Sequence, residues 1–172
     1  NPAANHSPIL YPALYTTPDP IKEYQILTEI QIEEIIDSFA QASRRACWAG
    51  FNGVEFHAAH GYLLSSFLSP LRNQRADSYG GSVKKRARIL IEILKKSREN
   101  VESDFILGVR MNISDGLEGG MTPELAVETA KLIAPYVDYI NLSAGFSETC
   151  GKVMITPCYV EAPTLASKIR SV

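Results

Sequence analysis

The chain has 172 residues, of which 45% are hydrophobic and 21% charged, and its net charge is −2. These values are typical of a globular domain and exclude a disordered chain. The near-neutral charge, without a basic cluster, argues against nucleic acid or an anionic membrane as a partner. No apolar run approaches the ~20 residues of a membrane span, so we expect a cytoplasmic protein. Three cysteines at unrelated spacings predict reduced thiols (Cys47, Cys150, Cys158).

The ends of the sequence suggest a part of a longer protein, because the chain begins Asn1-Pro2 without a methionine and stops at Val172 within a helical pattern. Residues 1–27 contain five prolines and no sustained hydrophobic period. This composition predicts an extended N-terminal loop or arm. Residues 28–172 are predicted to form the folded domain.

The first regular element is a helix that begins after Thr28, where Thr28 and Gln31 form a capping-box pattern. Apolar residues at helical spacing continue to about Ala49, and Gly50 is a natural stop. A strand is predicted over 53–57. A long connection rich in turn residues follows, over about 58–81, and then a helix that starts at the N-cap Ser82 and runs to about residue 100.

A continuous apolar run over 105–111 predicts a buried parallel strand. Residues 115–120 form a predicted loop, and Thr122-Pro123-Glu124 supplies the start of a helix that runs to about residue 134. A third strand is predicted over 139–143. After a second long connection, 162–172 has the pattern of a further helix.

Regular alternation of strands and helices predicts a parallel sheet with helices outside it, hence an α/β fold. The glycine fingerprint of dinucleotide-binding sheets is missing after all three strands, which favours a TIM (β/α)8 barrel. Three strands cannot close a barrel of eight. The predicted fold is therefore a partial TIM barrel.

Polar residues follow each predicted strand at the end where ligands bind in parallel α/β proteins. They are His57, His60 and Tyr62 after the first strand, Arg110 and Asn112 at the second, and Asn141 and Ser143 at the third. The two histidines admit three interpretations: structural side chains bonded to the backbone, ligands of a metal that lacks an evident third ligand, or hydrogen-bond donors to an anion or carbonyl.

Two further side chains carry alternatives. Tyr62 is either a packed aromatic or a proton donor, because a phenol is protonated at neutral pH. Arg110, at the end of a buried strand, needs either an external anion or an ion pair with a loop carboxylate. Four arginines in and after the long connection indicate an ion-paired loop clamp with Asp77 more than a phosphate site (Arg72, Arg75, Arg86, Arg88).

Several motifs in sequence order resemble the Old Yellow Enzyme family of flavin oxidoreductases. They are the segments Gly50–Leu64 (GFNGVEFHAAHGYLL), Phe67–Pro70 (FLSP), Asn73–Ser82 (NQRADSYGGS), Gly108–Arg110 (GVR), Glu118–Thr122 (EGGMT) and Asp138–Gly145 (DYINLSAG). The resemblance covers about residue 28 to the C-terminus. It implies a TIM barrel of which this chain holds about strands 4 to 6.

The resemblance also implies residue roles and cofactors. His57 and His60 match the pair that hydrogen-bonds the carbonyl oxygen of the substrate, Tyr62 matches the proton donor, and Arg110 matches the arginine beside the flavin pyrimidine edge. The family uses FMN, which NADH or NADPH reduces, and passes hydride to an activated alkene, a small-molecule substrate. Arg110 would tune this cofactor chemistry through its charge.

The sequence departs from the family pattern at Lys84 and Lys85, where Glu-Asn is common. We expect the first three and last two strands, which supply most flavin contacts, to lie outside this chain. The last segment is closest to the 2-enoate or 2,4-dienoyl-CoA reductase branch, in which an iron–sulfur cluster and a second nucleotide domain belong to other parts of the protein. The alternatives are a non-catalytic partial barrel that self-associates through open strand edges, as a homo-oligomer, and a metal-dependent hydrolase.

Overall fold

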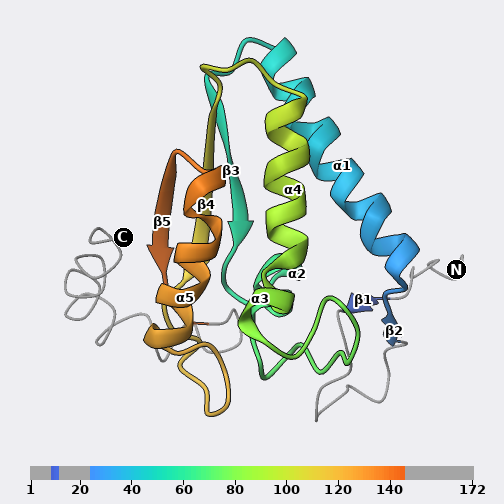
Figure 1. Ribbon diagram of the computed structural model, residues 1–172, viewed down its shortest axis with the longest axis vertical. Coiled ribbons are helices and arrows are strands. Elements are labelled where there is room, and N and C mark those ends of the chain that lie inside the picture. The colour runs from blue at the N-terminus through green and yellow to red at the C-terminus, as the bar shows by residue number, and fades with distance from the viewer. Residues whose placement is uncertain (1–8, 12–23, 146–172) are drawn as a thin grey trace, which may run out of the picture.

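The structure is a computed structural model that describes residues 9–11 and 24–145. Its centre is a parallel sheet of three strands in the order β3-β4-β5, with helices packed on one side (Figure 1). The strands are β3 (Gly53–Ala58), β4 (Ile106–Asn112) and β5 (Tyr139–Ser143). The helices are α1 (Glu29–Trp48), α2 (Leu63–Leu68), α3 (Val83–Arg86), α4 (Arg88–Glu99), α5 (Pro123–Ile133) and the 3-10 helix η1 (Ala134–Tyr136).

The two faces of the sheet differ in chemistry because side chains alternate along each strand. One face carries the buried core residues Phe56, Ala58, Leu107, Val109 and Met111, which pack under the helices. The other face carries Glu55 and His57 from β3, Gly108, Arg110 and Asn112 from β4, and Tyr139, Asn141 and Ser143 from β5. We call this second set the polar face.

The predicted helix starts are confirmed by their capping contacts. At α1 the Gln31 amide donates to Thr28 Oγ1 (3.2 Å) and the Thr28 amide donates to Gln31 Oε1 (2.9 Å), which completes the capping box. The side chains of Ser82 and Thr122 accept from the third amide beyond them, at 3.4 Å each. Gly50, at φ +84°, lies beyond the end of α1, where a left-handed residue favours glycine.

Two expectations for the middle of the chain were wrong in detail. The connection predicted over 58–81 contains α2, because Leu64, Phe67 and Leu68 at helical spacing all enter the core. The single helix predicted from Ser82 is interrupted at Ala87, whose ψ of −11° departs from α-helical geometry, although its amide still bonds the Val83 carbonyl (2.9 Å).

The N-terminal segment predicted as a loop or arm contains two short strands, β1 (Ile9–Tyr11) and β2 (Tyr24–Ile26), which pair in parallel. Sequence periodicity cannot detect strands of three residues. Residues 1–8 and 12–23 of that segment lie outside the described residues, as do the helix predicted over 162–172, Cys150 and Cys158. The division of the chain at residue 27 stays a prediction.

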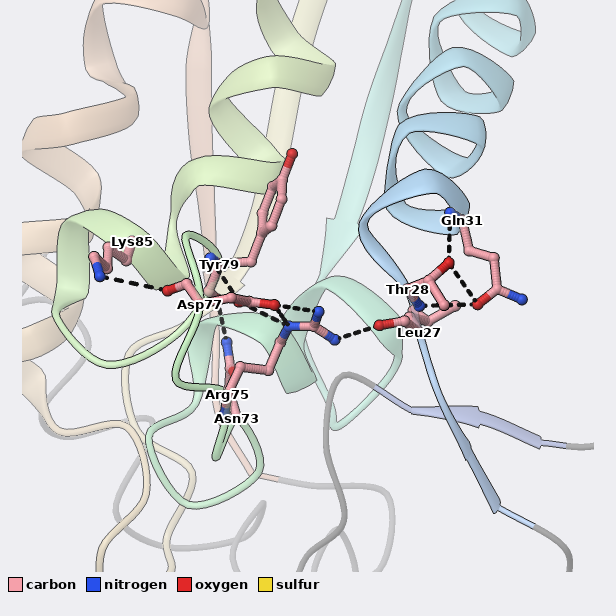
Figure 2. A network of polar contacts seen from close by, with 8 residues as sticks. All are labelled: Leu27, Thr28, Gln31, Asn73, Arg75, Asp77, Tyr79 and Lys85. Carbon is pink, nitrogen blue, oxygen red and sulfur yellow. Dashed lines mark hydrogen bonds and ion pairs between the residues drawn. The ribbon is translucent and has the colours of Figure 1, made fainter.

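Of the arginines predicted to clamp the long connection, Arg75 pairs with Asp77 (Figure 2). Arg88 pairs with Glu92 instead, and Arg86 Nε donates to the Leu68 carbonyl (2.9 Å). Arg75 Nε lies 3.1 Å from both carboxylate oxygens of Asp77, and its Nη1 donates to the Leu27 carbonyl (2.7 Å). Asn73 Nδ2 donates to the Tyr79 carbonyl (2.7 Å) from inside the same loop. The Arg75 hydrogen bond holds the pKa of Asp77 below its usual range. The clamp therefore fixes the loop against the start of α1.

Among the helices of the described residues, none combines the length and the apolar character needed to cross a bilayer.

Candidate active site

The three predicted catalytic residues of the first strand lie at the carboxyl end of β3. His57 is on the polar face within β3, and the chain then turns sharply, with φ +61° at His60 and +81° at Gly61. A histidine in the left-handed region costs about 1 kcal/mol, and such strain gathers at functional sites. The turn brings Tyr62 to the N-cap position of α2.

These side chains meet in space. The ring centroid of His57 lies 5.6 Å from that of His60 and 5.2 Å from that of Tyr62. Strand register places Arg110 of β4 beside His57, and Asn141 of β5 beside Arg110. The predicted residues of the first two strands therefore form one cluster on the polar face at the carboxyl end of the sheet.

His60 is the most constrained member of the cluster. Its Nδ1 lies 3.2 Å from the Gly145 carbonyl, its Nε2 lies 2.8 Å from Ser143 Oγ, and its amide donates to Asn112 Oδ1 (3.2 Å). Because a carbonyl can only accept, the network assigns the proton to Nδ1, and Nε2 accepts from the Ser143 hydroxyl. His60 thus ties the ends of three strands together, as the structural interpretation of this residue predicts.

A buried network behind His60 holds the strand ends in place. Asn112 Nδ2 donates to Asp115 Oδ1 (3.0 Å) and to the Gly145 carbonyl (3.1 Å). Asp115, only 1% exposed, also accepts from Ser69 Oγ and from the Met121 amide, both at 2.7 Å. Sequence reasoning missed Asp115, because an aspartate in a glycine-rich loop carries no sign of its burial.

His57, by contrast, lies on the polar face beside Arg110. Within the described part of the chain its ring nitrogens have no hydrogen-bond partner. Partial burial, and then the neighbouring charges of His60 and Arg110, lower the pKa of His57, while the Glu55 carboxylate opposes them. A neutral imidazole with an unused N–H suits donation to a carbonyl or oxyanion.

Tyr62 is 57% exposed and its hydroxyl has no partner among the described residues. It is therefore not a packed core aromatic. Its ring lies against His57, so a group bound to the imidazole would lie close to the phenol. The geometry is compatible with the predicted proton donor, and that role stays a prediction.

Arg110 forms an ion pair within the sheet, with Nε 3.0 Å from Glu55 Oε1. The partner is a strand carboxylate instead of the loop carboxylate considered from the sequence. Asn141 Nδ2 donates to Glu55 Oε2 (3.0 Å). Sequence reasoning missed Glu55, although a signal was present: it is a charged residue in an apolar strand, two positions before His57 and hence on the same face.

The metal interpretation gains no support from the geometry. Among the residues that the structure describes, no group of three His, Cys, Asp or Glu side chains could hold an ion. A histidine pair without a third protein ligand is a poor zinc site. The residues present suit a flavin better, since Arg110 and His57 carry donors on one polar face that no other described residue uses.

Comparison with known proteins identifies the family and the fold. Residues 5–143 match the model of the NADH:flavin oxidoreductase / NADH oxidase family. The chain is 41% identical over 124 residues to an NADH oxidase of Thermoanaerobacter brockii, covering 72% of this chain and 19% of that protein.

Two solved structures have the same fold. The complex of 2-naphthoyl-CoA reductase with 2-naphthoyl-CoA matches with a TM-score of 0.82 and 33% identity, over 93% of this chain and 25% of that one. An Old Yellow Enzyme homologue of Zymomonas mobilis matches with a TM-score of 0.69 and 25% identity, over 80% of this chain and 42% of that one. The predicted partial TIM barrel and the resemblance to the Old Yellow Enzyme family are both confirmed.

The chain spans between 15% and 38% of the length of eight curated relatives that it matches. The matched family model nevertheless covers most of the chain. The chain belongs to the NADH:flavin oxidoreductase / NADH oxidase family.

Proposed function

We propose that this chain supplies the substrate side of a flavin-dependent ene-reductase, with FMN as the cofactor and NADH or NADPH as the reductant. The single observation that carries the proposal is the cluster of His57, Tyr62 and Arg110 on one polar face at the carboxyl ends of adjacent strands. The substrates are α,β-unsaturated carbonyl compounds. The structurally similar 2-naphthoyl-CoA reductase binds 2-naphthoyl-CoA, which has a carbonyl next to an unsaturated ring. This similarity supports the proposed class of substrate.

Each residue has a part that follows from its position. Bound flavin supplies hydride transfer between the nicotinamide and the alkene. Neutral His57 donates to the carbonyl oxygen, where negative charge develops during reduction, a contribution of about 3 kcal/mol for a well-placed donor. Tyr62 delivers a proton to the α-carbon. Arg110 offers its terminal nitrogens to the acceptor edge of the flavin.

His60 has a more limited part than the family resemblance implies. Its Nδ1–H is used by the Gly145 carbonyl and its Nε2 accepts from Ser143. A hydrogen bond from His60 to substrate would require the Ser143 contact to break and a proton to occupy Nε2. We therefore infer that His57 is the principal donor and that His60 positions the turn that presents it.

Flavin binding tests the proposal directly. We expect the full-length protein that contains these strands to be yellow when purified, or to become so on addition of FMN, with the flavin fluorescence quenched on binding. Arg110→Ala should weaken this binding, whereas Arg45→Ala, an exposed residue near the end of α1, should not. A colourless protein that cannot be reconstituted with FMN would overturn the proposal.

One observation favours the second candidate, a non-catalytic partial barrel that self-associates. Within the described residues β3 and β5 are the edges of the sheet, and the polar face exposes Tyr139 and Ile106. Open strand edges pair readily with other chains. Size-exclusion chromatography with flavin titration separates the two: a flavin-binding monomer excludes self-association, and an oligomer without flavin affinity favours it.

A further inference from the structure

Glu55 occupies an unusual position for a carboxylate. It lies on β3, on the polar face, and its side chain is 26% exposed. Two nitrogen donors lie close to it: Arg110 Nε at 3.0 Å and Asn141 Nδ2 at 3.0 Å. Asn141 lies on β5, so Glu55 reaches across β4 to contact it.

Gly108, on the central strand, carries no side chain on this face. It lies beside Glu55 on β3 and beside Tyr139 on β5. A Cβ atom at Gly108 would lie 2.1 Å from the Tyr139 ring, so the ring occupies the space that a side chain of β4 would fill. The missing side chain therefore lets the Tyr139 ring lie over the central strand, on the same face as Glu55.

The contact with Glu55 uses only one edge of the Arg110 guanidinium. Nε is buried and lies 3.0 Å from Glu55 Oε1, although off the line of an ideal hydrogen bond. Nη1 and Nη2 have no partner among the described residues, and the side chain is 42% exposed. A guanidinium fixed through Nε presents its two terminal nitrogens as a rigid pair of donors.

We propose that Glu55 is a positioning residue for the flavin site, which fixes Arg110 through Nε and offsets its positive charge. This inference rests on the proposed function. Arg110 alone would strongly favour the reduced, more negative flavin. The Glu55 carboxylate reduces that preference while it holds the guanidinium in place, so Glu55 sets the balance between flavin reduction and flavin reoxidation.

The proposed effect of the Glu55 charge can be measured as a change in the reduction potential of the bound flavin. In flavin-loaded Glu55→Gln, loss of one negative charge beside Arg110 should favour flavin reduction on the order of tenfold, or about 30 mV for a two-electron couple. Glu55→Asp keeps the charge and should stay closer to the wild-type potential. Glu102→Gln, an exposed residue outside the sheet, is the control for net charge and should match the wild type.

The outcomes separate this inference from the proposed function. A wild-type protein that cannot bind flavin overturns both. Flavin-loaded Glu55→Gln with the wild-type potential overturns the inference alone, including the case in which it binds flavin more weakly, because Glu55 would then only support the sheet. A raised potential in Glu55→Gln, with little change in Glu55→Asp and none in Glu102→Gln, supports it.

Discussion

The buried network at Asp115 gives the most quantitative prediction for the structure. Asp115→Ala removes the acceptor of Ser69 Oγ and of the Met121 amide, both in a buried environment, and one of the two acceptors of Asn112 Nδ2. Each orphaned buried donor costs about 1–3 kcal/mol. Two such donors give about 4 kcal/mol, and water entering the vacated space reduces the expected loss to about 3 kcal/mol.

A second variant separates hydrogen bonding from charge. Asp115→Asn keeps one acceptor oxygen for Ser69 and Met121 and places an amide opposite Asn112 Nδ2, so we expect a smaller loss of about 1–2 kcal/mol. Removal of the charge also relieves the cost of burying it. If that relief dominated, the asparagine variant would be more stable than the wild type.

Urea unfolding followed by far-ultraviolet circular dichroism measures these differences, with Asp104→Ala as an exposed control. We expect the urea midpoint to be lowest for Asp115→Ala, higher for Asp115→Asn and highest for the wild type. The control should have the same midpoint as the wild type. An alanine variant as stable as the control would refute the reasoning that this network holds the strand ends.

Two further predictions concern local contacts. Nitrogen-15 NMR should show the neutral His60 ring with its proton on Nδ1, and Ser143→Ala should cost about 1 kcal/mol by removing the donor to Nε2; a proton on Nε2 in the wild type would contradict the assignment. Asp77→Asn should cost about 1 kcal/mol at pH 7, since the Arg75 pair is partly screened by solvent. Because the folded pKa of Asp77 is lowered, this stability is present above the unfolded value of about 3.9 and is lost as pH falls through the folded value. If the urea midpoints of the wild type and Asp77→Asn differed by the same amount at pH 7 and at low pH, this pH dependence would be contradicted.

The fold was largely predictable because its signals are local. The capping box of Thr28 and Gln31 set the start of α1, and the apolar runs set β3, β4 and β5 to within a residue. The helix α2 was obscured by the turn residues around it, although Leu64, Phe67 and Leu68 carried the helical spacing. Strands as short as β1 and β2 have no period to detect.

The site was predictable only as a set of positions at strand ends. That His57 and Arg110 are neighbours depends on the register between β3 and β4, which the sequence does not state. The hydrogen bond at His60 Nε2 depends on Ser143, which lies 83 residues further along the chain. Glu55 was recognisable by its alternation with His57. Its partner Asn141 on β5 was not, because that contact depends on the register of three strands.

The central claim is that this cluster binds and protonates an activated alkene beside a flavin. The most direct test is anaerobic stopped-flow of the flavin-loaded Tyr62→Phe variant, with NADH or NADPH for the first half-reaction and cyclohex-2-enone for the second. We predict flavin reduction at the wild-type rate and reoxidation by the enone slowed by about 10²-fold or more. Equal loss in both half-reactions, or no loss in either, would contradict the account.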